Sequence, residues 1–193
     1  MRSRLNDLLK NVLQNPRQLG DLLEEQVPWL NETVKREILS AASKLADPYL
    51  VGMGVRILNL NEERAEIKLP HNWKNSQNIG GSVHVGALCT VSELASRLLW
   101  EKHLPPALTS AQIQRLEANF LRPAVRDVRA ICHLPESDRE ALLFKLRSSS
   151  ETLFDHTVQV YDSEEQLVAE VSVEWKFRQQ ASLPAGKKVP GNI

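Results

Sequence analysis

The first quarter of the chain carries hydrophobic residues at the spacing of amphipathic helices. Leucine and valine recur at the i, i+3, i+4, i+7 positions of one helix face over residues 5–13, and more leucines follow at 19–23. A third helical run begins after Asn31, a residue type that caps helix N-termini, and ends at Pro48. Residues 1–47 are therefore predicted to form a helical extension.

This extension has two interpretations. Its helices could pack against the body of the protein. Alternatively, its first 17 residues, with four basic residues against one acidic residue, could rest on a membrane surface or a partner protein. Packing is favoured, because most amphipathic helices bury their apolar face within the protein.

From residue 48 onward the hydrophobic period changes to two, which predicts strands. Two short alternating runs, joined by a polar turn, predict a hairpin, and four further alternating runs follow. The six predicted strands lie at 53–58, 65–69, 116–120, 128–134, 154–160 and 167–177.

Two helical patterns interrupt these strands. The longer one runs over residues 83–102, and its apolar face is so wide that the helix is expected to be mostly buried. The shorter one begins at a Ser137-x-x-Glu140 capping box, and the tail from residue 181 onward is expected to be loose. This order predicts an α+β fold over residues 48–180, with an antiparallel sheet wrapped around one long central helix.

Composition narrows the class of protein. The chain has 24 basic and 24 acidic residues, and this zero net charge argues against a broad nucleic-acid-binding surface. No apolar run reaches the ~18 residues that a membrane span needs. The two cysteines form no Cys-x-x-Cys pair and are too few for a disulfide framework, so the cytoplasm is the expected location.

The segment that leads into the long helix is the first candidate for chemistry. Gly80 and Gly81 remove side chains near the helix start, where backbone N–H groups favour an anion or a polarised carbonyl oxygen. Asn78 could donate its side-chain amide there, and His84 lies in the first turn. A simpler interpretation is a tight glycine turn with Ser82 as the helix cap.

Glu93 is the second candidate, because it lies within an otherwise apolar helix. It could form an ion pair with Arg97 at i,i+4, or it could have a raised pKa suited to acid–base chemistry. Nine residues separate His84 from Glu93, which places them on opposite helix faces about 13 Å apart along the axis. Two such helices packed antiparallel about a two-fold axis would bring one chain's Glu93 to its partner's His84.

These residues resemble the signature of the PaaI-like acyl-CoA thioesterases, which have the hotdog fold. In that family an Asn lies six residues before a His and a carboxylate lies nine residues after it, as Asn78, His84 and Glu93 do here. The run 119–124 is similar to the aromatic-x-Arg-Pro-Ala strand and turn of these enzymes. The resemblance covers residues 48–178 and leaves the helical extension unexplained.

The resemblance implies hydrolysis of an acyl-CoA-type thioester at a site shared between two subunits. Glu93 would act as general base or nucleophile, and His84 would orient the thioester. The Asn78 amide would help to polarise the thioester carbonyl.

Four further residues are expected to bind the substrate. Gly80, Gly81 and Gly86 would let the thioester approach the helix N-terminus, and Arg122 at the rim would meet the phosphates of coenzyme A. No cofactor is expected. No metal ligand motif includes the other histidines, so none is assigned a metal.

The resemblance also implies a homodimer, two of which could associate further. Two sequence differences leave an alternative function open: Val85 stands where the family has its first Gly after the His, and Glu93 is one methylene longer than the commoner Asp. The alternative is a hotdog protein that binds acyl-CoA or another lipid without hydrolysing it. A hotdog dehydratase that acts on hydroxyacyl thioesters ranks lower, since those enzymes use a different loop arrangement.

Overall fold

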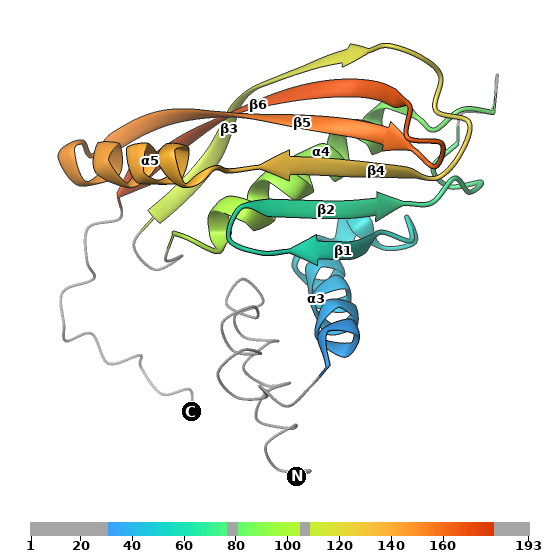
Figure 1. Ribbon diagram of the computed structural model, residues 1–193, viewed down its shortest axis with the longest axis horizontal. Helices are drawn as coiled ribbons and strands as arrows, with labels where there is room; N and C mark the ends of the chain where they lie inside the picture. Colours follow the sequence, from blue (N-terminus) through green and yellow to red (C-terminus); the bar gives the residue numbers. More distant parts are fainter. Residues whose placement is uncertain (1–30, 77–80, 105–108, 180–193) are drawn as a thin grey trace, which may run out of the picture.

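The computed structural model of the protein describes residues 31–76, 81–104 and 109–179. Within them, six strands form one antiparallel sheet in the order β1-β2-β4-β5-β6-β3 (Figure 1). The strands are β1 (Arg56–Leu60), β2 (Arg64–Leu69), β3 (Thr109–Phe120), β4 (Val128–His133), β5 (Glu151–Asp162) and β6 (Leu167–Gln179). The helices are α3 (Glu32–Ala46), α4 (Val85–Glu101) and α5 (Glu136–Ser148), with a 3-10 turn η2 (Pro48–Leu50). The predicted α+β architecture is confirmed.

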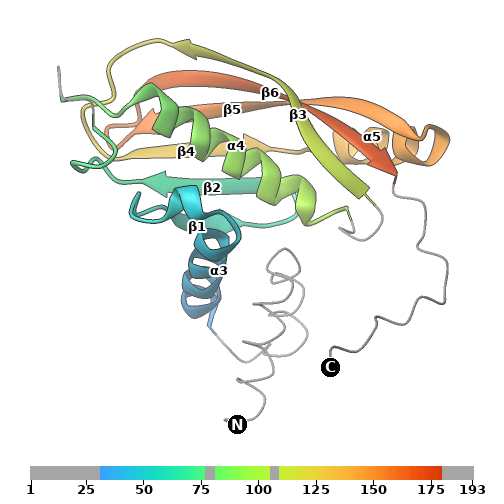
Figure 2. The ribbon, with the colours of Figure 1, turned by 180° about the vertical axis from the view of Figure 1, so that it is seen from behind.

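The long helix α4 lies across one face of the sheet (Figure 2). Val91, Leu94 and Leu99 are fully buried in the layer between helix and sheet, where they join side chains of β2, β4 and β5. Burial of each such aliphatic side chain stabilises the fold by about 1.5–3 kcal/mol, so this layer is the main core. Among the described residues, no helix is long and apolar enough to span a membrane.

The chain enters β1 through two glycines with positive φ. Gly52 has φ 85° and Gly54 has φ 73°, a backbone region that other residues rarely adopt. The alternating side chains of Met53, Val55 and Ile57 are all buried, as the predicted strand at 53–58 requires. The strand itself begins only at residue 56, because the glycines turn the backbone just before it.

Helix α3 begins after Asn31, as predicted, and the Asn31 side chain accepts a hydrogen bond from the Val34 amide at 2.9 Å. Two contacts fasten α3 to β1. The Ser40 hydroxyl oxygen accepts from the Ile57 amide at 2.9 Å, and the Arg36 guanidinium donates to the Leu58 carbonyl. This part of the helical extension therefore packs on the body of the protein. The two helices predicted before it lie outside the described residues.

The predicted capping box of α5 is wrong. The helix begins at Glu136, directly after Pro135, so Ser137 lies within the first turn and makes no capping bond. Instead, the Pro135 carbonyl accepts hydrogen bonds from the amides of Asp138 and Arg139. The first-turn carboxylates of Glu136 and Asp138 also stabilise this end of the helix, because they lie at the positive end of the helix dipole.

Strand β3 forms one end of the sheet and is much longer than the predicted 116–120. It pairs along its whole length with β6, from Thr109 opposite Gln179 to Phe120 opposite Ala169. Its other edge has no partner strand in the described part of the chain. Several apolar side chains on it are partly exposed: Ile113, Leu116 and Phe120.

Candidate active site

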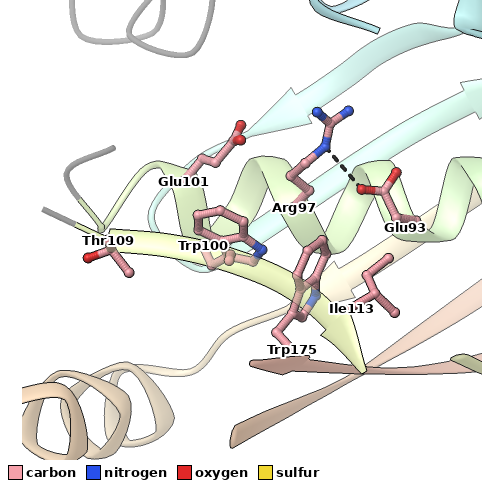
Figure 3. A pocket seen from close by; sticks show the side chains of 8 residues that line it. Glu93, Arg97, Trp100, Glu101, Thr109, Ile113 and Trp175 are labelled. Atoms are coloured by element: carbon pink, nitrogen blue, oxygen red, sulfur yellow. Dashed lines mark ion pairs between the residues drawn. The ribbon is translucent and has the colours of Figure 1, made fainter. Parts of the chain in front are cut away.

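A cavity of about 230 Å³ opens between the second half of α4 and the strands β3 and β6 (Figure 3). Its wall combines charged, aromatic and small side chains. The lining residues are Glu93, Arg97, Trp100, Glu101, Thr109, Ala111, Ile113 and Trp175. Of the two predicted catalytic residues that the structure describes, Glu93 and His84, only Glu93 lines this cavity.

Glu93 forms an ion pair with Arg97, one helical turn further on, with 3.1 Å between the Glu93 Oε1 and Arg97 Nε atoms (Figure 3). The ion pair that the sequence offered as the simpler interpretation is therefore present. It is not a solvated surface pair, however, because only 20% of the Glu93 side chain and 15% of the Arg97 side chain are exposed. Burial raises the pKa of Glu93, Arg97 lowers it, and Asp47 raises it.

A chain of neutral hydrogen bonds lies behind the cavity wall. The Trp175 indole N–H donates to the Ser96 hydroxyl oxygen at 2.7 Å, and Ser96 Oγ lies 2.7 Å from His156 Nδ1. Because an indole N–H can only donate, we assign the Ser96 proton to the bond with His156. We call Ser96, His156 and Trp175 the neutral chain.

His156 is a buried residue of the core. Its side chain is 3% exposed, and burial lowers its pKa to about 4. A neutral ring fits its role as acceptor of the Ser96 proton. Among the described residues, no group of His, Cys, Asp or Glu side chains has an arrangement that could hold a metal ion.

At the other end of α4, His84 is the N-cap residue. Its Nδ1 atom accepts a hydrogen bond from the Gly86 amide at 3.0 Å, and its side chain is exposed. Ser82, the cap in the simpler interpretation, is not used. The Gly86 amide is thus already bonded within the chain, and it could polarise a carbonyl only if the His84 ring turned away.

The glycine turn before α4 is described only in part. Gly81 adopts φ 62°, and a Cβ there would meet nothing within 4 Å, so its surroundings are open. Asn78 and Gly80 lie outside the described residues.

The start of α4 is fastened to two other segments. The Val83 amide donates to the Ala124 carbonyl at 2.7 Å, and the His84 amide donates to the Asn75 carbonyl at 2.6 Å. The Asn119–Ala124 motif and the His84 motif, which the sequence linked only by resemblance, are therefore neighbours in space.

Arg122, the predicted phosphate ligand, is exposed and donates to the Gln166 side chain at 2.9 Å. The two other arginines of this region, Arg126 and Arg129, form ion pairs with glutamates of the β5–β6 turn, and Arg129 also pairs with Glu66 of β2. This basic cluster is therefore largely neutralised by its own surroundings.

Sequence reasoning missed most of the cavity wall. Arg97 was expected only as an ion-pair partner of Glu93, and Thr109 lies seven residues before the predicted start of β3. The position of Trp175 could have been predicted from the regular alternation of β6, which puts every second side chain on the helix-facing side of the sheet.

The profile of a domain of unknown function, DUF4442, matches residues 35–177 of the chain. The chain belongs to this family. The DUF4442 match begins within α3 and ends in β6, so it includes the cavity and both ends of α4. No curated protein sequence matches the chain significantly.

Solved structures show that the DUF4442 chain has the hotdog fold. A Pseudomonas aeruginosa protein, described as a probable thioesterase of unknown function, aligns with a TM-score of 0.68 at 21% identity, over 78% of this chain and 97% of the other. A Haemophilus influenzae thioesterase aligns with a TM-score of 0.58 at 16% identity, over 75% and 90%. A Staphylococcus aureus thioesterase aligns with a TM-score of 0.55 at 17% identity, over 68% and 98%. The hotdog fold expected from the sequence is confirmed.

Proposed function

We propose that the protein hydrolyses acyl-CoA-type thioesters. The observation that carries this proposal is Glu93, a largely buried carboxylate that lines a cavity on the central helix of a hotdog fold. Burial raises the pKa of Glu93, which makes its carboxylate a stronger base than that of a solvated glutamate. The structural likeness to thioesterases supports the same class of reaction.

In this reaction the Glu93 carboxylate takes a proton from a water molecule, whose oxygen forms a bond to the thioester carbonyl carbon. The carbon–sulfur bond then breaks, and the thiolate leaves with the electron pair. The thiolate takes up the proton from Glu93, which releases the free thiol and restores the carboxylate.

The site is proposed to be shared between two subunits. His84 caps the start of α4, whereas Glu93 lines a cavity beside its second half, so one chain keeps the two residues apart. Strand β3 has an edge without a partner strand among the described residues, and apolar side chains on this strand are partly exposed. This edge supports a dimer formed along it, since long free edges are normally covered. In such a dimer the partner's His84 and Asn78 would orient and polarise the thioester beside Glu93.

Coenzyme A is proposed to bind at the rim near the start of α4. Arg122 is exposed there, and its present partner is an uncharged Gln166, so a phosphate would compete well for the guanidinium. The open surroundings of Gly81 support approach of the substrate. Both described cysteines are free, which agrees with a cytoplasmic location.

The test is thiol release from short, medium, long and aromatic acyl-CoA substrates. Wild-type protein is expected to turn over at least one of them, and Glu93→Gln is expected to lose about 10²–10⁴-fold in kcat, the usual contribution of a general base. Light scattering checks that the variant remains a dimer. Activity that survives Glu93→Gln in an intact dimer would refute the assignment.

A second function, acyl-CoA binding without hydrolysis, is favoured by one observation. The Gly86 amide already donates to the His84 ring, and the partly exposed Val85 side chain lies next to it in the chain. Fewer backbone N–H groups at the start of α4 are therefore available to bind a thioester carbonyl oxygen. Calorimetric binding of acyl-CoA with no thiol released would select this function.

A further inference from the structure

Glu93 belongs to a cluster of three charged residues that joins α4 to the helical extension. Arg97 lies between two carboxylates: its Nε atom is 3.1 Å from Glu93 Oε1, and its Nη2 atom is 3.5 Å from Asp47 Oδ2. Asp47 is the C-cap residue of α3. We call Asp47, Arg97 and Glu93 the charged cluster.

Asp47 is itself fixed by its own turn. Its Oδ1 atom accepts a hydrogen bond from the Tyr49 amide at 3.1 Å, and its backbone N–H donates to the Ser43 carbonyl at 2.9 Å. One carboxylate oxygen thus holds the turn, and the other faces Arg97. Since α3 is fastened to β1 through Ser40, Asp47 is a rigid anchor on the body of the protein.

Asp47 holds the Arg97 guanidinium group in place, and the guanidinium group in turn fixes the position of the Glu93 carboxylate. Its planar shape fixes the directions of Nε and Nη2 relative to each other, so a guanidinium held at one end by Asp47 presents its other end in a defined direction. The contact between Nε and Glu93 Oε1 is an ion pair and not a hydrogen bond, because the Nε–H has no hydrogen-bond acceptor among the described residues. Glu93 itself lines the cavity, so its carboxylate is within reach of a water molecule there.

The geometry points to Arg97 and Asp47 as positioning residues for Glu93: Asp47 orients the guanidinium, and the guanidinium keeps the Glu93 carboxylate ionised and directed at the cavity. The catalytic part of this inference rests on the proposed hydrolysis. It also gives the helical extension a place in the site, because Asp47 is its last residue. Arg97 itself is not assigned contact with the reacting atoms.

The charges around Glu93 act in opposite directions. Burial raises its pKa, Arg97 lowers it, and Asp47 raises it. Glu101 of the same helix also faces the cavity, whereas the lining residues from β3 and β6 carry no charge. Removing Arg97 should therefore raise the pKa of Glu93, and removing the charge of Asp47 should lower it.

Two substitutions test these opposite shifts. Arg97→Gln removes the cation, and Asp47→Asn removes one negative charge while it retains the oxygen that accepts from Tyr49. The Glu93 carboxyl is titrated by NMR in protein labelled with ¹³C-glutamate, and its signal is identified as the one missing in Glu93→Gln. The acid limb of kcat/KM against pH is measured on the same proteins.

We expect both readouts to move to higher pH in Arg97→Gln and to lower pH in Asp47→Asn. Arg97→Lys retains the charge without the planar fork, so it should restore the titration toward that of wild type while kcat stays reduced. Arg139→Gln on α5 is the matched control: it removes an equally ion-paired arginine outside the cavity lining and should shift neither readout.

Equal titration of Glu93 in wild type, Arg97→Gln and Asp47→Asn would overturn the inference, and so would shifts of the same sign in both variants. If the wild type releases no thiol from any substrate, the proposed hydrolysis fails. The NMR titration still decides in that case whether Asp47 and Arg97 control the ionisation of Glu93.

Discussion

Helix α4 carries two polar clusters on neighbouring residues, and they differ in almost every physical respect. The neutral chain is centred on Ser96, is buried in the core and makes short hydrogen bonds between uncharged groups. The charged cluster is centred on Arg97, lies at the cavity and leaves each side chain partly exposed. Neighbouring residues of one helix thus belong to a buried, uncharged arrangement and to a charged one at the cavity.

The difference follows from the cost of burial. A neutral donor can be buried completely if it finds an acceptor, whereas a charge must stay paired and near solvent, or its pKa shifts until it is neutral. His156 illustrates the second outcome, because its pKa falls to about 4 in the core. The Glu93 carboxylate is largely buried and also has a cationic partner, Arg97. This combination is expected of a carboxylate that acts as an acid or a base in catalysis. The two clusters should therefore respond differently to mutation and to pH.

The largest expected effect is on the neutral chain. Trp175→Ala should lower the free energy of unfolding by about 3–5 kcal/mol, because it leaves a large cavity beside Trp100 and frees the Ser96 oxygen. Urea denaturation measures this loss. Trp175→Phe retains the aromatic wall and removes only the N–H, so its loss should be clearly smaller. A Trp175→Ala protein as stable as wild type would show that the indole is not a core element.

Acid should destabilise the protein through His156, the titratable residue of the neutral chain. Burial lowers the pKa of His156 to about 4, against the opposing charge of Asp138, while an unfolded histidine titrates near 6.5. The unfolded chain therefore binds an extra proton between these values. Stability should be full above pH 6.5 and fall by about 3 kcal/mol as the pH drops to 4.

His156→Gln isolates this contribution, since every other titrating group remains. The free energy of unfolding is measured from pH 4 to pH 7 in both proteins. The wild-type curve should fall more steeply toward acid than the variant curve, and parallel curves would assign the acid sensitivity to other groups.

Much of the fold could be predicted from the sequence, because the core elements show their period directly. The apolar face of α4 and the alternation of β6 both correspond to buried side chains in the structure. The prediction of element bounds failed where buried apolar side chains do not recur at a regular period. In the first half of β3 only Ala111 and Ile113 alternate with polar residues, and the register shift between Ile113 and Arg115 breaks their phase with Leu116, so this edge segment gives only a weak strand signal. The capping box predicted at Ser137 is wrong because α5 already begins after Pro135, two residues earlier.

The candidate site was predicted less completely, for a different reason. Glu93 was found because a carboxylate is conspicuous in an apolar helix, and Arg97 because it lies one turn away. Asp47 is 50 residues from Arg97 in the chain, and only the docking of α3 on β1 brings the two together. No local pattern encodes such a contact.

Ser96 offers a smaller test of the neutral chain, with an internal control. Ser96→Ala leaves the Trp175 N–H and the His156 ring without their common partner, so it should cost about 2 kcal/mol. Ser92 is equally buried on the same helix, but its hydroxyl only donates to the Leu88 carbonyl, which already belongs to the helix. Ser92→Ala should therefore cost much less in urea denaturation. Equal losses of unfolding free energy would mean that the hydrogen bonds of the neutral chain add no stability beyond that of a buried hydroxyl.

The smallest effect on stability is expected at the charged cluster. Glu93→Gln retains the shape of the side chain, loses one attraction to Arg97 and removes the cost of burying a charge, so these changes largely cancel. The free energy of unfolding should change much less than in Trp175→Ala, because the Arg97 guanidinium keeps its ion pair with Asp47. The same substitution should nearly abolish thiol release. A loss of stability comparable to that of Trp175→Ala, with turnover retained, would instead make Glu93 a structural ion-pair residue and move the search for the base to another lining residue of the cavity.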